Sequence, residues 1–371
     1  MEQFAAALLG QDEPPPVTPS AFCQARKKLK YTAFAELNEA AIHAFSTHFA
    51  LRRWQGFRLL SVDGSTIRLP NTPAIAEAFG GPEDASCPMG RLSQCIDVLN
   101  KVILCADIAP YATGERELAS PYLYAASATD LFLYDRGYPA FWLFAQHRDM
   151  ERPFCMRVAL DFNTEVAAFV ASGLPSAVVT IAPNAEAVAQ CTEYNLSAEP
   201  VTVRLVRVEL DSGETEVLIT SLLDEAAFPA HWFKTLYHLR WGVEESYKRV
   251  KCRIEIENFS GKSPLSVYQD FHAKLLALNL TAMFVWIAQA VADRLHIRRR
   301  YVYQINFANA ITQMKNRVVR WLLGCDTDGL ALTLVCQMAR AVEPERPNRS
   351  APRKANTATH RRFHNNYKRT R

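Results

Sequence analysis

The side chains best suited to chemistry lie in one short segment, from Tyr237 to Lys251. Polar side chains in this segment are separated by steps of three or four residues. At about 3.6 residues per turn, such steps place side chains on one face of a helix. The spacing therefore predicts a helical face that carries one acid, three cations and a phenol, contributed by Tyr237, Arg240, Glu244, Lys248 and Lys251.

Glu244 is the acid that helical periodicity places on this face. Its neighbour Glu245 lies about 100° away around the helix, because each residue turns the chain by that angle. A ladder of i, i+4 salt bridges, from Arg240 to Glu244 and on to Lys248, is the alternative explanation of the spacing. An ordinary amphipathic helix presents one apolar face, so cations gathered around a single acid favour a binding site.

Two aspartates follow apolar, strand-like segments earlier in the chain. Asp63 comes directly after residues 57–62, and Asp135 comes directly after residues 131–134. A carboxylate just past a buried strand stands at the carboxyl edge of an α/β sheet, where such sheets bind ligands. Two neighbouring carboxylates repel each other unless a cation joins them. Taken alone, each aspartate is also explained as a turn or helix-capping residue.

This combination of carboxylates and cations suits phosphodiester chemistry. Hard Mg²⁺ or Mn²⁺ prefers oxygen ligands, and two such ions about 4 Å apart activate the attacking oxygen and stabilise the leaving one. Basic side chains one turn away would hold neighbouring phosphates, and a phenol can donate to another. We therefore predict two divalent ions bound by the catalytic residues Asp63, Asp135 and Glu244, with phosphate contacts from Tyr237, Arg240, Lys248 and Lys251.

Composition places the chain among cytoplasmic globular proteins. It has 371 residues, of which 49% are hydrophobic, enough for two to three domains with real cores. We find no uninterrupted apolar run of the roughly 18 residues that cross a bilayer, and the N-terminus is a poor signal peptide. The nine cysteines form no CxxC pair, which indicates reduced thiols. No Gly-rich phosphate loop supports an ATP-driven mechanism.

The charge of the chain is concentrated at one end. The formal net charge is +4, yet residues 346–371 contain only basic charged side chains and no Asp or Glu. A basic tail on a slightly acidic body suits a polyanionic partner. A solvated terminal charge run is the alternative.

Hydrophobic periodicity divides the chain into helical and β-rich stretches. Thr18 or Ser20 can cap a helix that begins near Ala21, and a second helical pattern runs to about residue 51. Predicted strands follow over residues 57–62, 66–69, 94–99, 102–108, 131–134, 177–181, 201–209 and 216–222. A mostly helical pattern then extends from about residue 227 to residue 323, and the rest is rich in Pro and Arg.

At these residues the chain resembles the DDE transposases of bacterial insertion sequences. The resemblance is to the insertion-sequence-four group, which is marked by a Tyr-x2-Arg-x3-Glu-x6-Lys signature that Tyr237, Arg240, Glu244 and Lys251 match at every spacing. Similar flanking motifs extend the resemblance over about residues 18 to 371. They are Asp63-Gly64-Ser65, Asp135-Arg136-Gly137-Tyr138, Gly114-Glu115-Arg116-Glu117-Leu118-Ala119 and Ile256-Glu257-Asn258-Phe259-Ser260-Gly261.

The resemblance implies an α/β fold with an RNase H-like (retroviral integrase) catalytic core, interrupted by a mostly β insertion between the second Asp and the Glu. It also implies Mg²⁺-dependent cleavage at mobile-element ends, strand transfer into target DNA and release of the element through a hairpin. The implied partner is double-stranded DNA, held by a homodimer in the synaptic complex and located at the nucleoid. No membrane partner is expected.

On this basis we expect five segments. Residues 1–55 form a helical N-terminal unit that contacts DNA, residues 56–152 and 226–342 form the two parts of the core, residues 153–225 form the β-rich insertion, and residues 343–371 form a basic disordered tail.

The N-terminal region departs from the family pattern. Family members often carry a longer region that reads the terminal inverted repeat, whereas only a short segment precedes Phe22. We therefore expect a shortened or decayed copy with an intact site and impaired end recognition. Two alternatives to a transposase stay open, an RNase H-like nuclease and a catalytically idle DNA-binding descendant.

Overall fold

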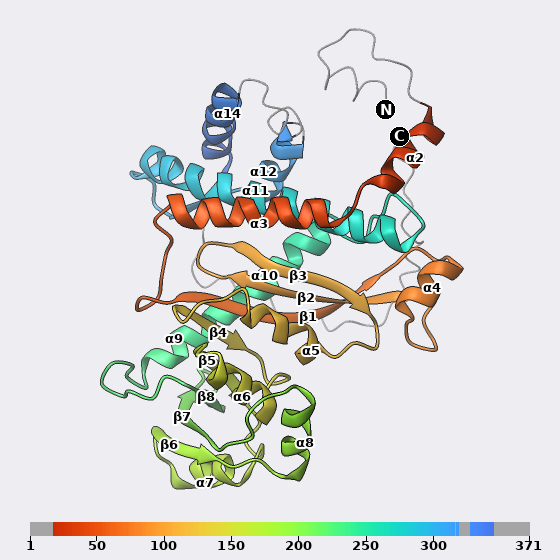
Figure 1. Cartoon of the computed structure of the whole chain (residues 1–371). Coiled ribbons are helices and arrows are strands. Elements are labelled where there is room, and N and C mark those ends of the chain that lie inside the picture. Colours follow the sequence, from red (N-terminus) through yellow and green to blue (C-terminus); the bar gives the residue numbers. More distant parts are fainter. Residues whose placement is uncertain (1–17, 316, 319–326, 345–371) are drawn as a thin grey trace.

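A central sheet of eight strands organises the part of the chain that the computed structural model describes, residues 18–315, 317–318 and 327–344 (Figure 1). The predicted α/β class is thereby confirmed. The strands are β1 (Arg58–Arg68), β2 (Met89–Asp97), β3 (Val102–Pro110), β4 (Asp130–Tyr134), β5 (Phe154–Val158), β6 (Ser176–Ile181), β7 (Val201–Glu209) and β8 (Thr215–Thr220).

The strands lie in the order β3-β2-β1-β4-β5-β8-β7-β6. At the centre, β1 pairs parallel with β4, and β4 pairs parallel with β5. All other neighbours in the sheet are antiparallel. The parallel strands β1 and β4 therefore have their carboxyl ends at the same edge, which is where a carboxylate pair can form.

Alternating side chains of the central strands pack into two separate cores, one on each face of the sheet. In β4, Leu131 and Leu133 enter one core, whereas Phe132 and Tyr134 enter the other. This alternation follows from the two-residue repeat of a strand. Because both faces of β4 are covered, all five of its residues are buried, as expected for a central parallel strand.

A helical layer covers one face of the sheet, with α11 and α3 at its centre (Figure 1). Its helices are α3 (Thr32–His48), α11 (Pro264–His296), α12 (Phe307–Lys315) and α14 (Thr327–Arg340), joined by a small sheet of β9 (Tyr303–Ile305) and β10 (Val342–Pro344). Asn279 of α11 is fully buried, and its amide bonds both the N–H and the C=O of Ile103 on β3. It also donates to Asn38 of α3, so one polar side chain fastens this layer to the edge strand.

By length and composition, α11 could cross a membrane, and most of its apolar window is buried inside the molecule. In the sequence we considered only uninterrupted apolar runs. α11 contains polar residues, yet its length and mean hydropathy are those of a helix that could span a bilayer. Its packing against α3, α12 and α14 is the environment of a core helix.

Five of the remaining helices connect successive strands: α4 (Pro73–Phe79), α5 (Glu115–Ala119), α6 (Phe141–Asp149), α7 (Thr164–Ser172) and α8 (Ala185–Glu193). α2 (Pro19–Lys28) contacts α11. α9 (Trp232–His238) and α10 (Gly242–Lys248) lead from β8 to α11 and share its core. Together α6, α7 and α8 pack on strands β4 to β8 and form the lower lobe of the molecule (Figure 1).

The sequence predicted most strands and the N-terminal helices. Thr18 caps α2, its hydroxyl accepting from the N–H of Ala21. The ranges 57–62 and 66–69 form one continuous strand, β1, and β5 together with α4, α7 and α8 was not predicted as separate elements.

The predicted insertion, residues 153–225, does not form a separate sheet. Its strand β5 pairs directly with β4, and β6 to β8 extend the central sheet from β5. The predicted basic tail lies outside the described residues beyond position 344, as do the first 17 residues.

Candidate active site

Asp63 and Asp135 occupy the carboxyl ends of the parallel pairing between β1 and β4. The two strands pair through residues 58–61 of β1, and Asp63 lies two residues beyond the last of these pairs. Asp135 directly follows β4. We had placed Asp63 at the end of its strand; instead, β1 continues to Arg68 in antiparallel pairing with β2.

The two aspartates lie close enough to repel each other. The pKa of Asp63 is raised to about 7, first by burial and next by the charge of Asp135, although a hydrogen bond from the Gly64 N–H and the nearby Arg240 act against this shift. The backbone orients both carboxylates: the N–H of Gly64 donates to Asp63 Oδ1 over 2.9 Å, and the N–H of Gly137 donates to Asp135 Oδ1 over 2.7 Å.

The segment that carries Glu244 is helical, but it is not one uniform α-helix. A 3₁₀ turn over Leu239–Trp241 separates α9 from α10, and a π-helical turn over Arg249–Arg253 follows α10. These turns rotate the chain by different angles per residue than an α-helix does. Equal spacing in the sequence therefore no longer places every side chain on one face.

Two of the five predicted side chains, Tyr237 and Lys251, hydrogen-bond the β1 and β4 strands near the aspartates. The hydroxyl of Tyr237 donates to the C=O of Tyr134, the residue before Asp135. Lys251 Nζ donates to Ser65 Oγ over 2.6 Å and to the C=O of Thr66 over 2.8 Å. The signature helix is thereby fastened to both strands that carry the aspartates.

Arg240 links Glu244 to the aspartate pair. Its guanidinium is buried, lies 5.6 Å from the ring centre of Tyr237, and has Nη2 3.6 Å from Glu244 Oε1. The same cation lowers the pKa of Asp63. Arg240 Nε has no hydrogen-bond partner among the described residues, so this buried cation retains a free donor beside the acids.

Lys248 lies one turn after Glu244 in the regular helix α10. It forms an ion pair with Glu245 and its side chain is 68% exposed. It lines a groove of about 460 Å³ together with Lys101, Arg249 and Arg253. A phosphate-binding role for Lys248 stays a prediction.

The described residues hold no group of three Asp, Glu, His or Cys side chains arranged to bind a metal ion. Asp63 and Asp135 are adjacent, whereas Glu244 is directed to Arg240. The raised pKa of Asp63 nevertheless fits a cation site, since two partly buried carboxylates without a full counter-charge gain most from a bound cation.

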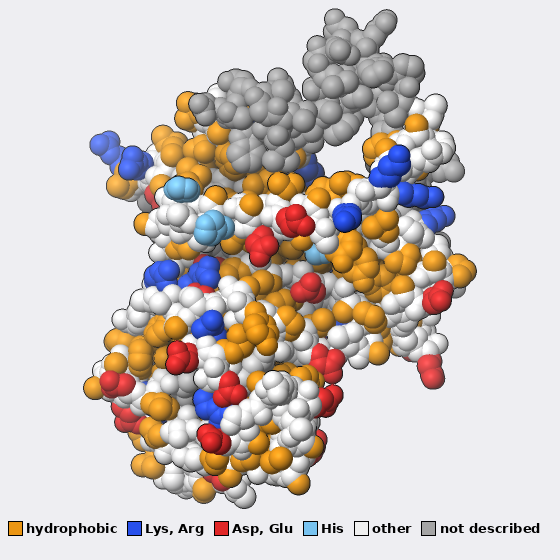
Figure 2. All heavy atoms as spheres, viewed as in Figure 1, with side chains coloured by type: hydrophobic (Ala, Val, Ile, Leu, Met, Phe, Trp, Pro, Cys, Tyr) orange, Lys and Arg blue, Asp and Glu red, His pale blue; other side chains and the backbone are white. Residues whose placement is uncertain are grey.

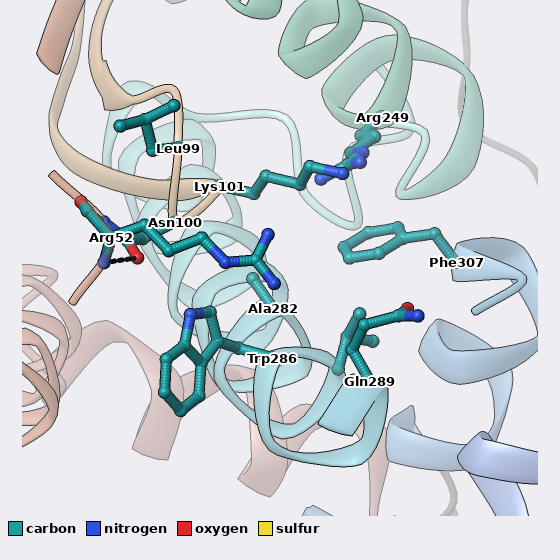
Figure 3. Close-up of a pocket in the computed structure, with 10 residues that line it drawn as sticks. Arg52, Leu99, Asn100, Lys101, Arg249, Ala282, Trp286, Gln289 and Phe307 are labelled. Atoms are coloured by element: carbon teal, nitrogen blue, oxygen red, sulfur yellow. Dashed lines mark hydrogen bonds between the residues drawn. The ribbon is translucent and has the colours of Figure 1, made fainter. Parts of the chain in front are cut away.

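A second basic cavity adjoins the groove that Lys248 lines. It has a volume of about 50 Å³ and shares Lys101, Arg249 and Phe307 with the larger groove. The charged ends of Arg52 and Lys101 extend toward Arg249 and Phe307 (Figure 3). The Arg249 guanidinium lies 4.3 Å from the ring centre of Phe307. Sequence reasoning missed Arg52, Lys101, Arg249 and Arg253, because the first two come from segments far from the last two, which follow α10.

Surface charge differs between the two ends of the molecule. Figure 2 shows Lys and Arg side chains gathered over α2, whereas Asp and Glu side chains are scattered over the lobe of α7, α8 and β6. The last turn of α2 contains Arg26, Lys27 and Lys28. Arg26 bonds Gln269 and Asp270 of α11, which leaves the two lysines as the exposed cations of this turn.

Glu115 is a further acid that sequence reasoning missed as a site residue. It opens α5, and a side chain at position 64 would have its Cβ only 2.6 Å from Glu115 Oε2. Gly64 is thus required for this close approach. The carboxylate also raises the pKa of Asp63 and forms an ion pair of 2.9 Å with Arg91. Its only sequence signal was its place in the flanking motif at residues 114–119.

Comparisons with known proteins identify the class to which this site belongs. The family model for the transposase DDE domain matches residues 54–280, which span the central sheet, the signature helix and the first half of α11. The chain therefore belongs to the transposase DDE domain family, and its activity class is that of a DNA transposase. This domain is generally dependent on divalent metals.

Two relatives from Escherichia coli (strain K12) share part of the sequence. The chain is 25% identical to the transposase InsG for insertion sequence element IS4 over 356 residues, which cover 91% of this chain and 76% of the relative. It is 27% identical to the putative transposase InsZ over 88 residues, 22% of this chain and 29% of the relative. The first match confirms the predicted resemblance to the insertion-sequence-four group.

One solved structure aligns with most of the chain. It is the cryo-EM structure of the piggyBac transposase synaptic complex with hairpin DNA, matched over 90% of this chain and 66% of that chain, with a TM-score of 0.43 and 12% sequence identity. The chain thus spans about two thirds of the length of that transposase.

Proposed function

We propose that the protein cleaves DNA at the ends of a mobile element and joins these ends to target DNA, with Asp63, Asp135 and Glu244 as its catalytic carboxylates. The observation that carries this proposal is the repelling pair of Asp63 and Asp135 at the end of the parallel β1–β4 pairing. The anchoring of the signature helix to both strands supports it.

An RNase H-like core is the fold that this proposal requires. The strand order β3-β2-β1-β4-β5, in which β1, β4 and β5 are parallel and only β2 runs antiparallel to the other four, supports it. Within this scheme β5 belongs to the core and β6 to β8 belong to the insertion. The division into residues 1–55, 56–152, 153–225, 226–342 and 343–371 stays a prediction; by this criterion the insertion starts after Val158, at least six residues later than position 153.

Asp63 and Asp135 would hold the divalent ions, Mg²⁺ or Mn²⁺, and Glu244 would complete the set. When bound, such ions activate an attacking oxygen and stabilise the leaving oxygen of a phosphodiester. For Glu244 to join the aspartates, its carboxylate must leave Arg240, to which it now lies 3.6 Å. The guanidinium would then be free for a phosphate oxygen.

The polar side chains around the acids would bind and orient the DNA backbone. Arg240 can present its unpaired Nε to a phosphate beside the acids. Tyr237 and Lys251 hold the helix on the strands, so in this state they position the site. Lys248, Arg249 and Arg253 would follow the backbone along the groove, since cations that contact phosphates fix the register of the duplex.

Double-stranded DNA is the proposed partner, both at the element ends and at the target. A homodimer that joins two ends and a location in the cytoplasm at the nucleoid complete the proposal.

Cleavage assays test this function directly. Duplexes that carry the genomic sequence on either side of the coding region should be nicked or joined by the full-length protein with Mg²⁺ or Mn²⁺. Asp63→Asn, Asp135→Asn and Glu244→Gln should each lower the rate by at least about 10³-fold, because each removes an ionised ligand. Unchanged rates in all three variants would refute the assignment.

The same assay separates the two alternatives. Cleavage of any duplex without joining would indicate a nuclease. Binding of DNA with no metal-dependent cleavage would indicate an idle descendant.

A further inference from the structure

We propose that Glu115 and Tyr138 are outer members of the carboxylate centre, where they bind the water molecules of a hydrated divalent cation held by Asp63 and Asp135. This inference rests on the proposed function, because it requires that the aspartate pair binds a cation. It assigns new roles to two residues outside the Asp-Asp-Glu set.

Glu115 is brought to the centre by two independent contacts of α5. Its carboxylate lies against the backbone of Gly64, next to Asp63. One residue later, Arg116 Nε donates to the C=O of Gly137 over 2.9 Å, in the loop that follows Asp135. The short helix thus touches the chain shortly after each aspartate, and its first carboxylate lies next to Asp63.

Arg91 forms an ion pair with one oxygen of the Glu115 carboxylate. Arg91 Nη1 lies 2.9 Å from Glu115 Oε1, and its guanidinium lies 5.1 Å from the ring centre of Tyr111. The ion pair involves one carboxylate oxygen of Glu115, while Oε2 is the oxygen nearest to Gly64. Glu115 therefore retains an oxygen directed to the site.

The buried hydroxyl of Tyr138 is the second observation that points to a ligand. Tyr138 is only 1% exposed, and its hydroxyl has no hydrogen-bond partner among the described residues. After burial, the groups that most raise the pKa of Tyr138 are the carboxylates of Asp63, Glu115 and Asp135, in that order. A buried hydroxyl without a partner is costly, and here it lies next to three acids that attract a cation.

Hydrated Mg²⁺ explains both observations. Mg²⁺ gives up its waters reluctantly, so proteins commonly bind it through one or two carboxylates and leave several waters in place. Two adjacent aspartates with no third acid in direct reach match this requirement. Waters bound to the ion are strong donors, and Glu115 and the Tyr138 oxygen are acceptors placed around them. Such outer partners orient the metal and typically contribute 10–100-fold to its affinity.

Titration of Mn²⁺ into the full-length protein without DNA tests the inference. Calorimetry should show that Glu115→Gln raises the Kd for Mn²⁺ by about 10–100-fold, and that Tyr138→Phe raises it by about tenfold. A Kd for Glu115→Gln within twofold of the unmodified protein would overturn the role of Glu115, and the corresponding result for Tyr138→Phe would overturn that of Tyr138.

Glu117→Gln is the matched control. Glu117 lies on the same helix two residues further on. Its carboxylate accepts a hydrogen bond from the Gly114 N–H, and its charge raises the pKa of Tyr194, the residue directly after α8. It carries the same charge as Glu115, so a general effect of charge would weaken Mn²⁺ binding in both variants. We expect Glu117→Gln to leave the affinity unchanged, and an equal loss in the two variants would overturn the inference.

Arg91→Gln separates metal binding from packing. It breaks the same ion pair as Glu115→Gln but leaves the Glu115 carboxylate in place. We expect lower thermal stability in both variants and weaker Mn²⁺ binding chiefly in Glu115→Gln. If Arg91→Gln weakened binding as much, the effect of Glu115 would be structural.

The number of waters on bound Mn²⁺ distinguishes outer from direct contact. Electron spin-echo measurements in isotopically labelled water should count equal numbers in the unmodified protein and in Glu115→Gln at saturating Mn²⁺. A gain of one water in the variant would show that Glu115 is a direct ligand and overturn its outer role.

Asp63→Asn and Asp135→Asn separate this inference from the proposed function. If neither affects Mn²⁺ binding, the metal centre itself is wrong. If both abolish binding while Glu115→Gln does not weaken it, only the role of Glu115 fails.

Discussion

At the scale of single residues, the site combines acids that were predicted from the sequence with others, such as Glu115, that were not. Asp63, Asp135 and the Arg240–Glu244 pair come from predicted motifs. The pKa of Asp63 stands above its ordinary value because burial and Asp135 both oppose its ionisation. Without a cation, the centre is therefore electrostatically strained.

The raised pKa of Asp63 predicts how metal binding depends on pH. A cation requires the ionised carboxylate, so below about pH 7 it must displace a proton from Asp63. We expect the affinity for Mn²⁺ to fall by up to about tenfold per pH unit below pH 7 and to level off above it. Calorimetry from pH 5.5 to pH 8.5 measures this, and an affinity independent of pH would contradict it.

The same residue predicts the stability of the metal-free protein. Because folding raises the pKa of Asp63, the folded state binds more protons between about pH 4 and pH 7, and the contribution of Asp63 to stability is lost as pH rises through this range. Asp63→Asn should therefore be more stable than the unmodified protein at pH 8 in chelator. The exposed Asp161→Asn serves as control, and equal melting temperatures of all three proteins would contradict the prediction.

At the scale of elements, polar contacts determine how helices dock on the sheet edge. β3 is an edge strand, so one side of its backbone has no neighbouring strand. Asn279 of α11 supplies the missing hydrogen bonds at Ile103. The Ile103 N–H donates to Asn279 Oδ1 over 2.9 Å, and Asn279 Nδ2 donates to the Ile103 C=O over 2.7 Å. Such a contact satisfies backbone groups that would otherwise be buried without a partner.

Asn279→Ala should destabilise the protein markedly. It removes three hydrogen bonds and leaves the N–H and C=O of Ile103 unsatisfied, at about 1–3 kcal/mol for each unsatisfied group. Chemical denaturation should show a loss of about 2–5 kcal/mol in the free energy of unfolding. Gln190→Ala, an exposed amide on α8, is the control. A loss below about 1 kcal/mol in Asn279→Ala would mean that water replaces the amide.

At the scale of the whole molecule, basic side chains from distant segments form one groove. Lys101 follows β2, while Lys248, Arg249 and Arg253 belong to or follow α10. The acids of the site face the end of the β1–β4 pair instead. A duplex that follows the groove would reach the acids along the signature helix.

The groove predicts the salt dependence of DNA binding. The logarithm of the binding constant for duplex DNA falls with the logarithm of salt concentration by about 0.9 per neutralised phosphate. Lys248→Ala and Arg253→Ala should each reduce this slope by about one. Arg294→Ala, an exposed cation at the end of α11, should leave the slope unchanged. Equal slopes for all variants would place the duplex elsewhere.

Local patterns in the sequence predicted much of the architecture. The all-apolar run at residues 131–134 indicated a central strand, and Thr18 marked the start of α2, because an apolar run and a capping residue are both signals within a few neighbouring residues. The motifs around Asp63 and Asp135 likewise pointed to one sheet edge, since each aspartate directly follows an apolar run that predicts a strand.

What the sequence by itself determined was the class of protein and its principal acids, because spacing within a motif survives in the fold wherever the local geometry is regular. Only the tertiary structure decided which side chains meet. Lys248 pairs with Glu245 and lines a groove with Lys101 of a distant segment, and Glu115 reaches Asp63 from a separate helix, α5, whose first residue lies against Gly64. Contacts between distant segments depend on how whole elements pack, and no periodicity in a single segment encodes them.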